Sequence, residues 1–218
     1  MSEGEGEREP WRRSRSGRGA RAERESPAER RERRAQVDDP AVVLEAAARF
    51  LEVRARSVTE VRRRLGQAGY RSELVEAAIV RLTELGMLDD ATFARTWIES
   101  RDRARPRGEI ALRRELAVKG VDRSIVDELL EERRDDGAGR DGGVDLAAAE
   151  RLLARHERAL AREIDPRSRR RRAFALLARN GFDPATCGAA AAAYVKNDAG
   201  ISEEQAFGEA AADDGDSG

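Results

Sequence analysis

A leucine followed four residues later by a glycine recurs three times in this chain, as Leu65-x-x-x-Gly69, Leu116-x-x-x-Gly120 and Leu177-x-x-x-Gly181. Glycine readily adopts the left-handed conformation that ends many helices, so each copy predicts the end of a helix. The glycines lie 51 and 61 residues apart, a spacing typical of tandem repeats in which each unit packs mainly against its neighbours. The chain is therefore predicted to form an array of small helical units and not one compact bundle.

The residues around the repeated leucine support this alignment. Superimposing the first two copies places Val61 on Leu112 and Leu74 on Ile125, so the predicted core positions stay apolar in both. In the third copy the equivalents are smaller, with Ala173 in place of Val61. The third unit is thus the weakest match to the repeat.

Polar segments separate and flank the predicted units. The three-helix units are expected at residues 41–88, 89–134 and 144–196. Residues 135–143, DDGAGRDGG, have the composition of a flexible linker. Residues 1–38 are rich in Arg, Glu, Ser and Gly, and residues 197–218 carry seven acidic and no basic residues, so both tails are predicted to be disordered. The predicted fold is all-α: an elongated, curved array with two disordered tails.

The composition agrees with small helical units and indicates the cellular compartment. Apolar and charged residues each make up 39% of the chain and aromatic residues 4%, which disfavours a sandwich or barrel. The single cysteine excludes an internal disulfide, and the first residues lack the apolar core of a signal peptide. The sequence also contains no apolar run as long as a membrane helix. These features predict a cytoplasmic protein.

The inventory of reactive residues argues against catalysis. His156 is the only histidine and falls on an apolar helical stripe, where a histidine at the edge of the core is expected. Cys187 lies at a core-equivalent position and is predicted to be a small buried side chain. Asp89 and Asp90 precede a helix and are expected to cap it, not to bind Mg²⁺. The sequence therefore predicts no enzyme, no cofactor and no metal.

Arginines recur at positions that the repeat makes equivalent. Arg62 and Arg113 lie three residues before the repeated leucine, and Arg63 and Arg114 lie two before it. Other arginines surround the break near Pro106 or open the corresponding helix of the third unit. The candidate partner- or DNA-binding residues are Arg62, Arg63, Arg105, Arg107, Arg113, Arg114, Arg169 and Arg170. Pairing with glutamates on the same helix would explain many of them, but their concentration favours a surface for an anionic partner.

The residues bear on two nucleic-acid-binding functions. A helix-turn-helix transcription factor would place residues 72–85 in the major groove, yet this segment carries three glutamates and one arginine, so phosphates would repel it. A single-stranded nucleic-acid binder would need aromatic stacking platforms. Because most aromatic residues are expected in the cores, only Trp11 and Tyr70 look free for that role.

Three groups of residues carry a resemblance to a known family. They are Arg56, Ser57, Glu60, Val61, Leu65 and Gly69; Leu88, Asp89, Asp90, Phe93, Ala94 and Trp97; and Arg105, Pro106, Gly108, Leu112, Glu115, Leu116, Lys119 and Gly120. In order and spacing they resemble the RecX family, the bacterial regulators of the RecA recombinase. The resemblance covers about residues 44–130, so the third unit and both tails lie outside it.

This resemblance implies a regulatory protein in DNA repair, homologous recombination and the SOS response. Members of the family lie in the helical groove of RecA assembled on single-stranded DNA and inhibit its ATPase and strand exchange. The expected partners are thus the RecA filament and single-stranded DNA, contacted directly or through the filament, with the protein acting as a monomer. A RecA-independent single-stranded nucleic-acid-binding protein remains the alternative.

Overall fold

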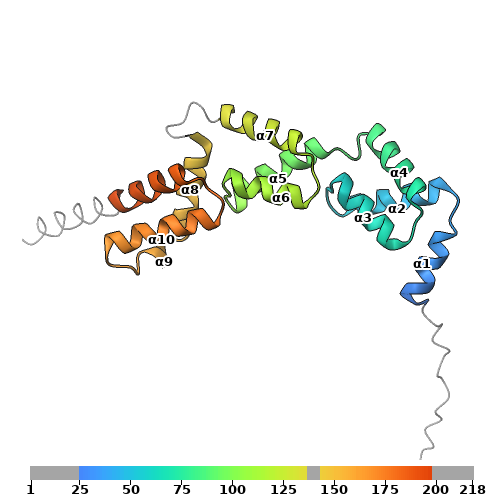
Figure 1. The fold of residues 1–218 in the computed structure, drawn as a ribbon, viewed down its shortest axis with the longest axis horizontal. Helices are drawn as coiled ribbons and strands as arrows, with labels where there is room; N and C mark the ends of the chain where they lie inside the picture. The colour runs from blue at the N-terminus through green and yellow to red at the C-terminus, as the bar shows by residue number, and fades with distance from the viewer. Residues whose placement is uncertain (1–24, 137–142, 198–218) are drawn as a thin grey trace, which may run out of the picture.

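The computed structural model describes residues 25–136 and 143–197, which form an elongated row of helices (Figure 1). The labelled helices are α1 (Pro27–Ala35), α2 (Pro40–Glu52), α3 (Val58–Ala68), α4 (Ser72–Glu84), α5 (Asp90–Ala104), α6 (Glu109–Val118), α7 (Arg123–Asp136), α8 (Gly143–Arg155), α9 (Glu157–Leu160) and α10 (Pro166–Arg179). Residues 184–197 are also helical, and the two described stretches contain no strand. The prediction of an all-α array of three-helix units is confirmed.

The first unit packs α2, α3 and α4 around an aliphatic core. Its buried residues are Val43, Ala47, Val61, Leu65, Val75, Ala78, Ile79, Leu82 and Leu88. Helix α3 begins after Ser57, whose Oγ accepts a hydrogen bond from the Glu60 amide at 3.1 Å, and ends at Gly69 with φ of 102°. The four-residue spacing of Val61 and Leu65 turns one face of α3 into this core.

The second unit repeats this arrangement with α5, α6 and α7. Asp89 caps α5 by accepting hydrogen bonds from the amides of Ala91 and Thr92. The buried residues are Phe93, Ala94, Ile98, Leu112, Leu116, Val121, Val126, Leu129 and Leu130. Leu112 and Leu116 are 0% exposed, at the positions where the sequence repeat places core residues.

The third unit, formed by α8, α9, α10 and the helix of residues 184–197, has a core of smaller side chains. Its buried residues are Ala148, Ala149, Leu152, Leu153, Leu160, Ala173, Leu177, Phe182, Cys187, Ala190 and Ala191. Cys187 is fully buried, as its core-equivalent position predicts, and this burial raises the pKa of its thiol. Alanines at these positions let the helices approach more closely than valine or leucine would.

His156 is exposed, so the prediction that it borders the core is wrong. Helix α8 ends at Arg155 and α9 begins at Glu157, so the chain turns at His156 although the apolar periodicity continues. The His156 ring places Nδ1 3.0 Å from the carbonyl oxygen of Leu152. The apolar stripe is real, but it is divided between two helices.

The first and second units meet where α3 begins and α6 ends. Ser57 Oγ donates a hydrogen bond of 2.6 Å to the carbonyl oxygen of Lys119. Thr59 Oγ1 donates one of 3.1 Å to the carbonyl oxygen of Gly120. The last carbonyls of a helix have no partner within it, so the two hydroxyls satisfy groups that would otherwise need water.

The second and third units meet in the equivalent way, where α6 begins and α10 ends. The amides of Gly108 and Ile110 donate hydrogen bonds of 3.1 Å each to the carbonyl oxygens of Asn180 and Gly181. At this second joint, backbone amides donate to the carbonyls at the end of a helix, as the Ser57 and Thr59 hydroxyls do at the first joint. A Cβ on Gly108 would lie 2.3 Å from the Gly181 oxygen, so the direct backbone contact depends on the missing side chain.

A carboxylate completes each joint. Asp90 accepts a hydrogen bond of 2.8 Å from the Val58 amide of the first unit, and Asp145 accepts one of 3.2 Å from the Glu109 amide of the second. Burial raises the pKa of Asp90, although this hydrogen bond opposes the shift. The prediction that both aspartates cap their own helix therefore holds for Asp89 alone, because Asp90 caps α3 of the neighbouring unit.

Helix α1 lies within residues 1–38, which were expected to be disordered throughout. Ser26 and Glu29 form a reciprocal capping box at its start. At its other end Arg34 reaches the Ala68 carbonyl oxygen at 3.5 Å and lies 5.7 Å from the centre of the Tyr70 ring. Capping and contacts with α3 hold this helix in place, although it buries no residue of its own. The rest of the two predicted tails, residues 1–24 and 198–218, and residues 137–142 of the predicted linker lie outside the described residues.

Candidate functional site

The first arginine of each repeated pair is bound within its own unit. Arg62 Nε and Nη2 donate hydrogen bonds of 2.6 and 2.8 Å to the Glu76 carboxylate. At the equivalent position Arg113 forms an ion pair with Asp127 and donates a hydrogen bond of 2.6 Å to Glu109. In both units the carboxylate lies fourteen residues after the arginine, so the repeat includes this ion pair. Hydrogen bonding to Arg62 lowers the pKa of Glu76.

The second arginine of each pair has a different environment. Arg63 on α3 and Arg114 on α6 are exposed, and neither forms an ion pair with another described residue. Their guanidinium groups therefore remain available to an external anion. Because they occupy equivalent positions of adjacent units, they place an exposed positive charge at the same position of both units.

The two arginines beside Pro106 also differ from each other. Arg105 follows the last residue of α5 and is exposed. Arg107 is half-buried, with Nε 3.3 Å from a Glu115 carboxylate oxygen and a hydrogen bond to the Asn180 side chain. Arg107 therefore holds the second and third units together, whereas Arg105 remains available for a partner.

The same division applies to the third unit. Arg169 Nε donates a hydrogen bond of 2.8 Å to the carbonyl oxygen of Glu163, which fixes it against the loop before α10. Arg170 is exposed on α10. Of the eight predicted arginines, those that project into solvent without an ion pair inside the described chain are Arg63, Arg105, Arg114 and Arg170.

Several motif residues belong to a structural cluster that the sequence did not reveal. Glu115 accepts hydrogen bonds from Trp97 Nε1 at 2.9 Å and from Arg101 Nε at 2.7 Å. The Trp97 ring lies 4.4 Å from the Arg101 guanidinium and 5.0 Å from Lys119 Nζ. Lys119 also donates a hydrogen bond of 2.7 Å to buried Glu60 of the first unit. These motif residues therefore stabilise the second unit and its joint with the first.

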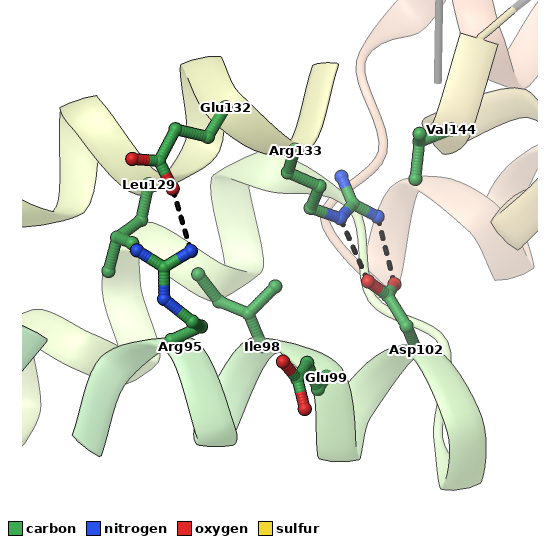
Figure 2. Close-up of a pocket in the computed structure, with 8 residues that line it drawn as sticks. All are labelled: Arg95, Ile98, Glu99, Asp102, Leu129, Glu132, Arg133 and Val144. Atoms are coloured by element: carbon green, nitrogen blue, oxygen red, sulfur yellow. Dashed lines mark hydrogen bonds and ion pairs between the residues drawn. The ribbon is translucent and has the colours of Figure 1, made fainter. Parts of the chain in front are cut away.

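A cavity of about 250 Å³ lies between α5, α7 and the start of α8 (Figure 2). Ile98, Leu129 and Val144 supply its apolar lining. Arg133, on one side, donates two hydrogen bonds of 2.9 Å to the Asp102 carboxylate, and it also binds Asp145 of the third unit at 2.5 Å. Burial alone would lower the pKa of Arg133, but these hydrogen bonds raise it, so the guanidinium stays charged. None of the predicted site residues lines this cavity.

Together these features define a class of protein: a tandem array of three-helix units, joined end to end, with one exposed arginine at the equivalent position of its first two units. Within the described segments no three or more His, Cys, Asp or Glu residues gather as a metal site would require. The features are those of a helical repeat protein, in which each unit packs mainly against its neighbours.

Comparison with known proteins identifies the family. The family model described as the first three-helix domain of RecX matches residues 44–82, and the model of the second domain matches residues 89–130. Regulatory protein RecX of Mycobacterium avium is 34% identical over 134 residues, which cover 62% of this chain and 73% of that protein. The RecX of Mycolicibacterium vanbaalenii is 35% identical over 141 residues, which cover 62% and 72%. The chain belongs to the RecX family of regulatory proteins.

Solved structures agree on the fold. The crystal structure of RecX from Lactobacillus salivarius superimposes with a TM-score of 0.60 at 18% identity, over 70% of this chain and 94% of that one. The resemblance stated from the motifs is therefore confirmed, and the third unit lies outside both matched domains. None of the helices in the described stretches is both long and apolar enough to cross a membrane.

Proposed function

We propose that this protein binds the RecA recombinase assembled on single-stranded DNA, inhibits its ATPase and strand exchange, and acts as a monomer in the cytoplasm. Membership of the RecX family supports the choice of partner. The elongated array supports the mode of binding, because a row of similar units can contact successive subunits of a filament. The partner is a protein assembly on DNA, so the phosphates of the DNA offer negative charge.

The observation that carries the proposal is the equivalence of Arg63 and Arg114. Both are exposed and unpaired in the described chain, and each occupies the same position in its unit. Arg105 and Arg170 extend this set along the second and third units. Arg62 and Arg113, by contrast, would act mainly by holding their units together, since each is engaged by a carboxylate of its own unit.

The decisive experiment measures the single-strand-stimulated ATPase rate of RecA from the same organism, titrated with this protein at two salt concentrations. The rate should fall at substoichiometric amounts of the protein, and less so at high salt, because surface charge pairs are screened. The double variant Arg63→Glu with Arg114→Glu should require at least about tenfold more protein for the same inhibition.

A charge-matched control separates the contact from the change in net charge. Arg33→Glu with Arg81→Glu removes the same charge at two exposed positions that pair with Glu25 and Glu84. This control should inhibit like the native protein. An unchanged ATPase rate with excess native protein would refute the proposed function, and equal inhibition by both double variants would refute the assignment of Arg63 and Arg114.

A further inference from the structure

A groove between α1 and α3 gathers four arginines and no acidic residue along its lining. Arg30, Arg31 and Arg34 come from α1, and Arg64 comes from α3, with Gln67 beside it. The groove has a volume of about 570 Å³. We refer to it as the arginine groove. Helix α1, one wall of the groove, precedes the residues matched by the family models, which begin at residue 44. Helix α3, the other wall, lies within them.

The contact that forms the groove is close at the end of α3. A Cβ on Gly69 would lie 2.5 Å from the Arg31 side chain and 2.6 Å from the Arg31 carbonyl oxygen. Helix α1 can therefore approach α3 only because Gly69 has no side chain and accepts a positive φ. The groove thus depends on the same glycine that ends α3.

The nearby carboxylates Glu25 and Glu29 act electrostatically on Arg30, but no described carboxylate pairs with Arg31 or Arg64. Glu25 pairs with Arg33 at 2.9 Å, and Glu29 binds the Ser26 amide in the capping box. Arg31 and Arg64 are exposed and form no ion pair within residues 25–136 and 143–197. Like charges held together without counter-charges cost free energy, and an anion in the groove would remove that cost.

Two aromatic rings border a second hollow that shares Arg34 and Arg64 with the groove. This hollow is also lined by Phe50 and Tyr70 and has a volume of about 310 Å³. The Arg34 guanidinium lies 5.7 Å from the Tyr70 ring centre, and that of Arg64 lies 5.8 Å from the Phe50 ring centre. Arginines that follow a groove, with aromatic rings beside them, are the combination by which proteins bind single-stranded nucleic acid.

We infer that the arginine groove binds the sugar-phosphate backbone of single-stranded nucleic acid, with a base placed against Tyr70 in the adjoining hollow. Arg31 and Arg64 contact phosphates, and Arg34, between the groove and the ring, contacts both the backbone and the base. A duplex keeps its bases stacked inside, so it could use the arginines but not the ring. The inference concerns a strand without RecA, and it therefore does not depend on the proposed function.

The test uses the full chain and a fluorescently labelled oligodeoxythymidine, with binding followed by anisotropy at several salt concentrations and no RecA present. Arg31→Glu with Arg64→Glu should weaken binding at least about tenfold. It should also reduce the slope of log affinity against log salt by about 1.4, since each lost phosphate contact on a single strand removes about 0.7. The control, Arg81→Glu with Arg123→Glu, changes the net charge equally at two exposed positions away from α1, which pair with Glu84 and Asp127, and should stay within about twofold of the native protein.

A second variant tests the ring. Tyr70→Leu keeps an apolar side chain at a position packed against the first core but removes the stacking surface. It should weaken the binding of oligodeoxythymidine about fivefold or more. The affinity for an abasic strand of equal length should stay unchanged, since that strand has no base to stack on the ring. Circular dichroism and urea unfolding of every variant check that the helices are retained.

Two results would overturn the inference. Equal binding by the groove variant and its charge-matched control would show that only net charge matters. Equal affinity for duplex and single strand, with no effect of Tyr70→Leu, would exclude a single-strand site. Because RecA is absent, tight binding to the oligonucleotide with no effect on the RecA ATPase would leave this inference standing and refute the proposed function alone.

Discussion

Ser57 and Lys119, 62 residues apart in sequence, are joined by a hydrogen bond of 2.6 Å from the serine Oγ to the lysine carbonyl oxygen. The same Oγ accepts a hydrogen bond from the Glu60 amide, and the Lys119 ammonium donates one to the Glu60 carboxylate. Three residues of the family motifs thus form one closed network across the first joint. This network explains why motif residues can be needed without touching a partner.

Replacing Ser57 by alanine should lower the free energy of unfolding by about 1–2 kcal/mol, because both the cap of α3 and the bond to Lys119 are lost at a fully buried position. Urea unfolding followed by circular dichroism measures the change. Ser72→Ala is the control, since Ser72 Oγ binds only the exposed Glu73 carboxylate and should cost less than about 0.5 kcal/mol. Equal effects would show that the joint adds nothing to the stability of the fold.

Gly108→Ala should destabilise the protein by about 1–3 kcal/mol, since the new methyl group would lie 2.3 Å from the Gly181 oxygen and force the second joint apart. The φ of Gly108 is −75°, so backbone strain does not contribute. Gly66→Ala is the matched control: it has no atom within 4 Å of the added Cβ and lies within α3, so it should stabilise by up to about 1 kcal/mol. The midpoints of urea unfolding compare the two, and a neutral Gly108→Ala would contradict the joint.

Stability should fall in acid partly through Glu60. Burial tends to raise the pKa of this carboxyl, but the hydrogen bond and charge of Lys119 and the charge of Arg54 together lower it below its usual 4.5. A carboxylate with a lowered folded-state pKa contributes stability above about pH 4.5, and this contribution is lost as the pH falls through the folded-state value.

Glu60→Gln should accordingly cost about 1.5–3 kcal/mol at neutral pH, and the difference from the native protein should narrow in acid. Unfolding in urea at a series of pH values from neutral to acid measures both effects. A constant difference over the whole range would show that the charge of Glu60 is not involved.

Arg133→Ala should destabilise by about 3 kcal/mol, because the Asp102 and Asp145 carboxylates would lose their common partner. Figure 2 shows the pair with Asp102. Arg134→Ala is the control, since Arg134 is 55% exposed and meets Glu109 at 3.3 Å, where an ion pair contributes little. Thermal unfolding measures the two variants. If the third unit separates from the second before global unfolding, the thermal unfolding curve of Arg133→Ala alone should show a second transition.

The repeat in the sequence predicted the core positions and the order of the units, because apolar periodicity and terminal glycines are local signals. It also predicted the equivalence of Arg62 with Arg113. The ion pairs that these arginines form with Glu76 and Asp127 were missed, since each carboxylate lies on a different helix from its arginine, whereas the pair of Arg113 with Glu109 lies within one helix. Contacts between side chains of different helices leave no local pattern in a single sequence.

The lack of a local signal also explains two of the errors in the fold. Helix α1 has no apolar stripe, and only the capping box at Ser26 and Glu29 signalled it. His156 continued the apolar period of α8, although the chain turns there. The groove between α1 and α3 could not be predicted either. An arginine-rich segment without apolar residues, such as α1, has the composition of a disordered tail.

The joints have the same polarity, since α10 ends against the start of α6 and α6 ends against the start of α3. A unit inserted between two others would find a matching surface on both sides, so the length of such a protein can change in whole steps without redesign of its interior. Helix α1 covers the end of α3 at Gly69, where a further unit would dock. The end of α3 that the direction of the joints leaves open is therefore covered by a helix of the same chain.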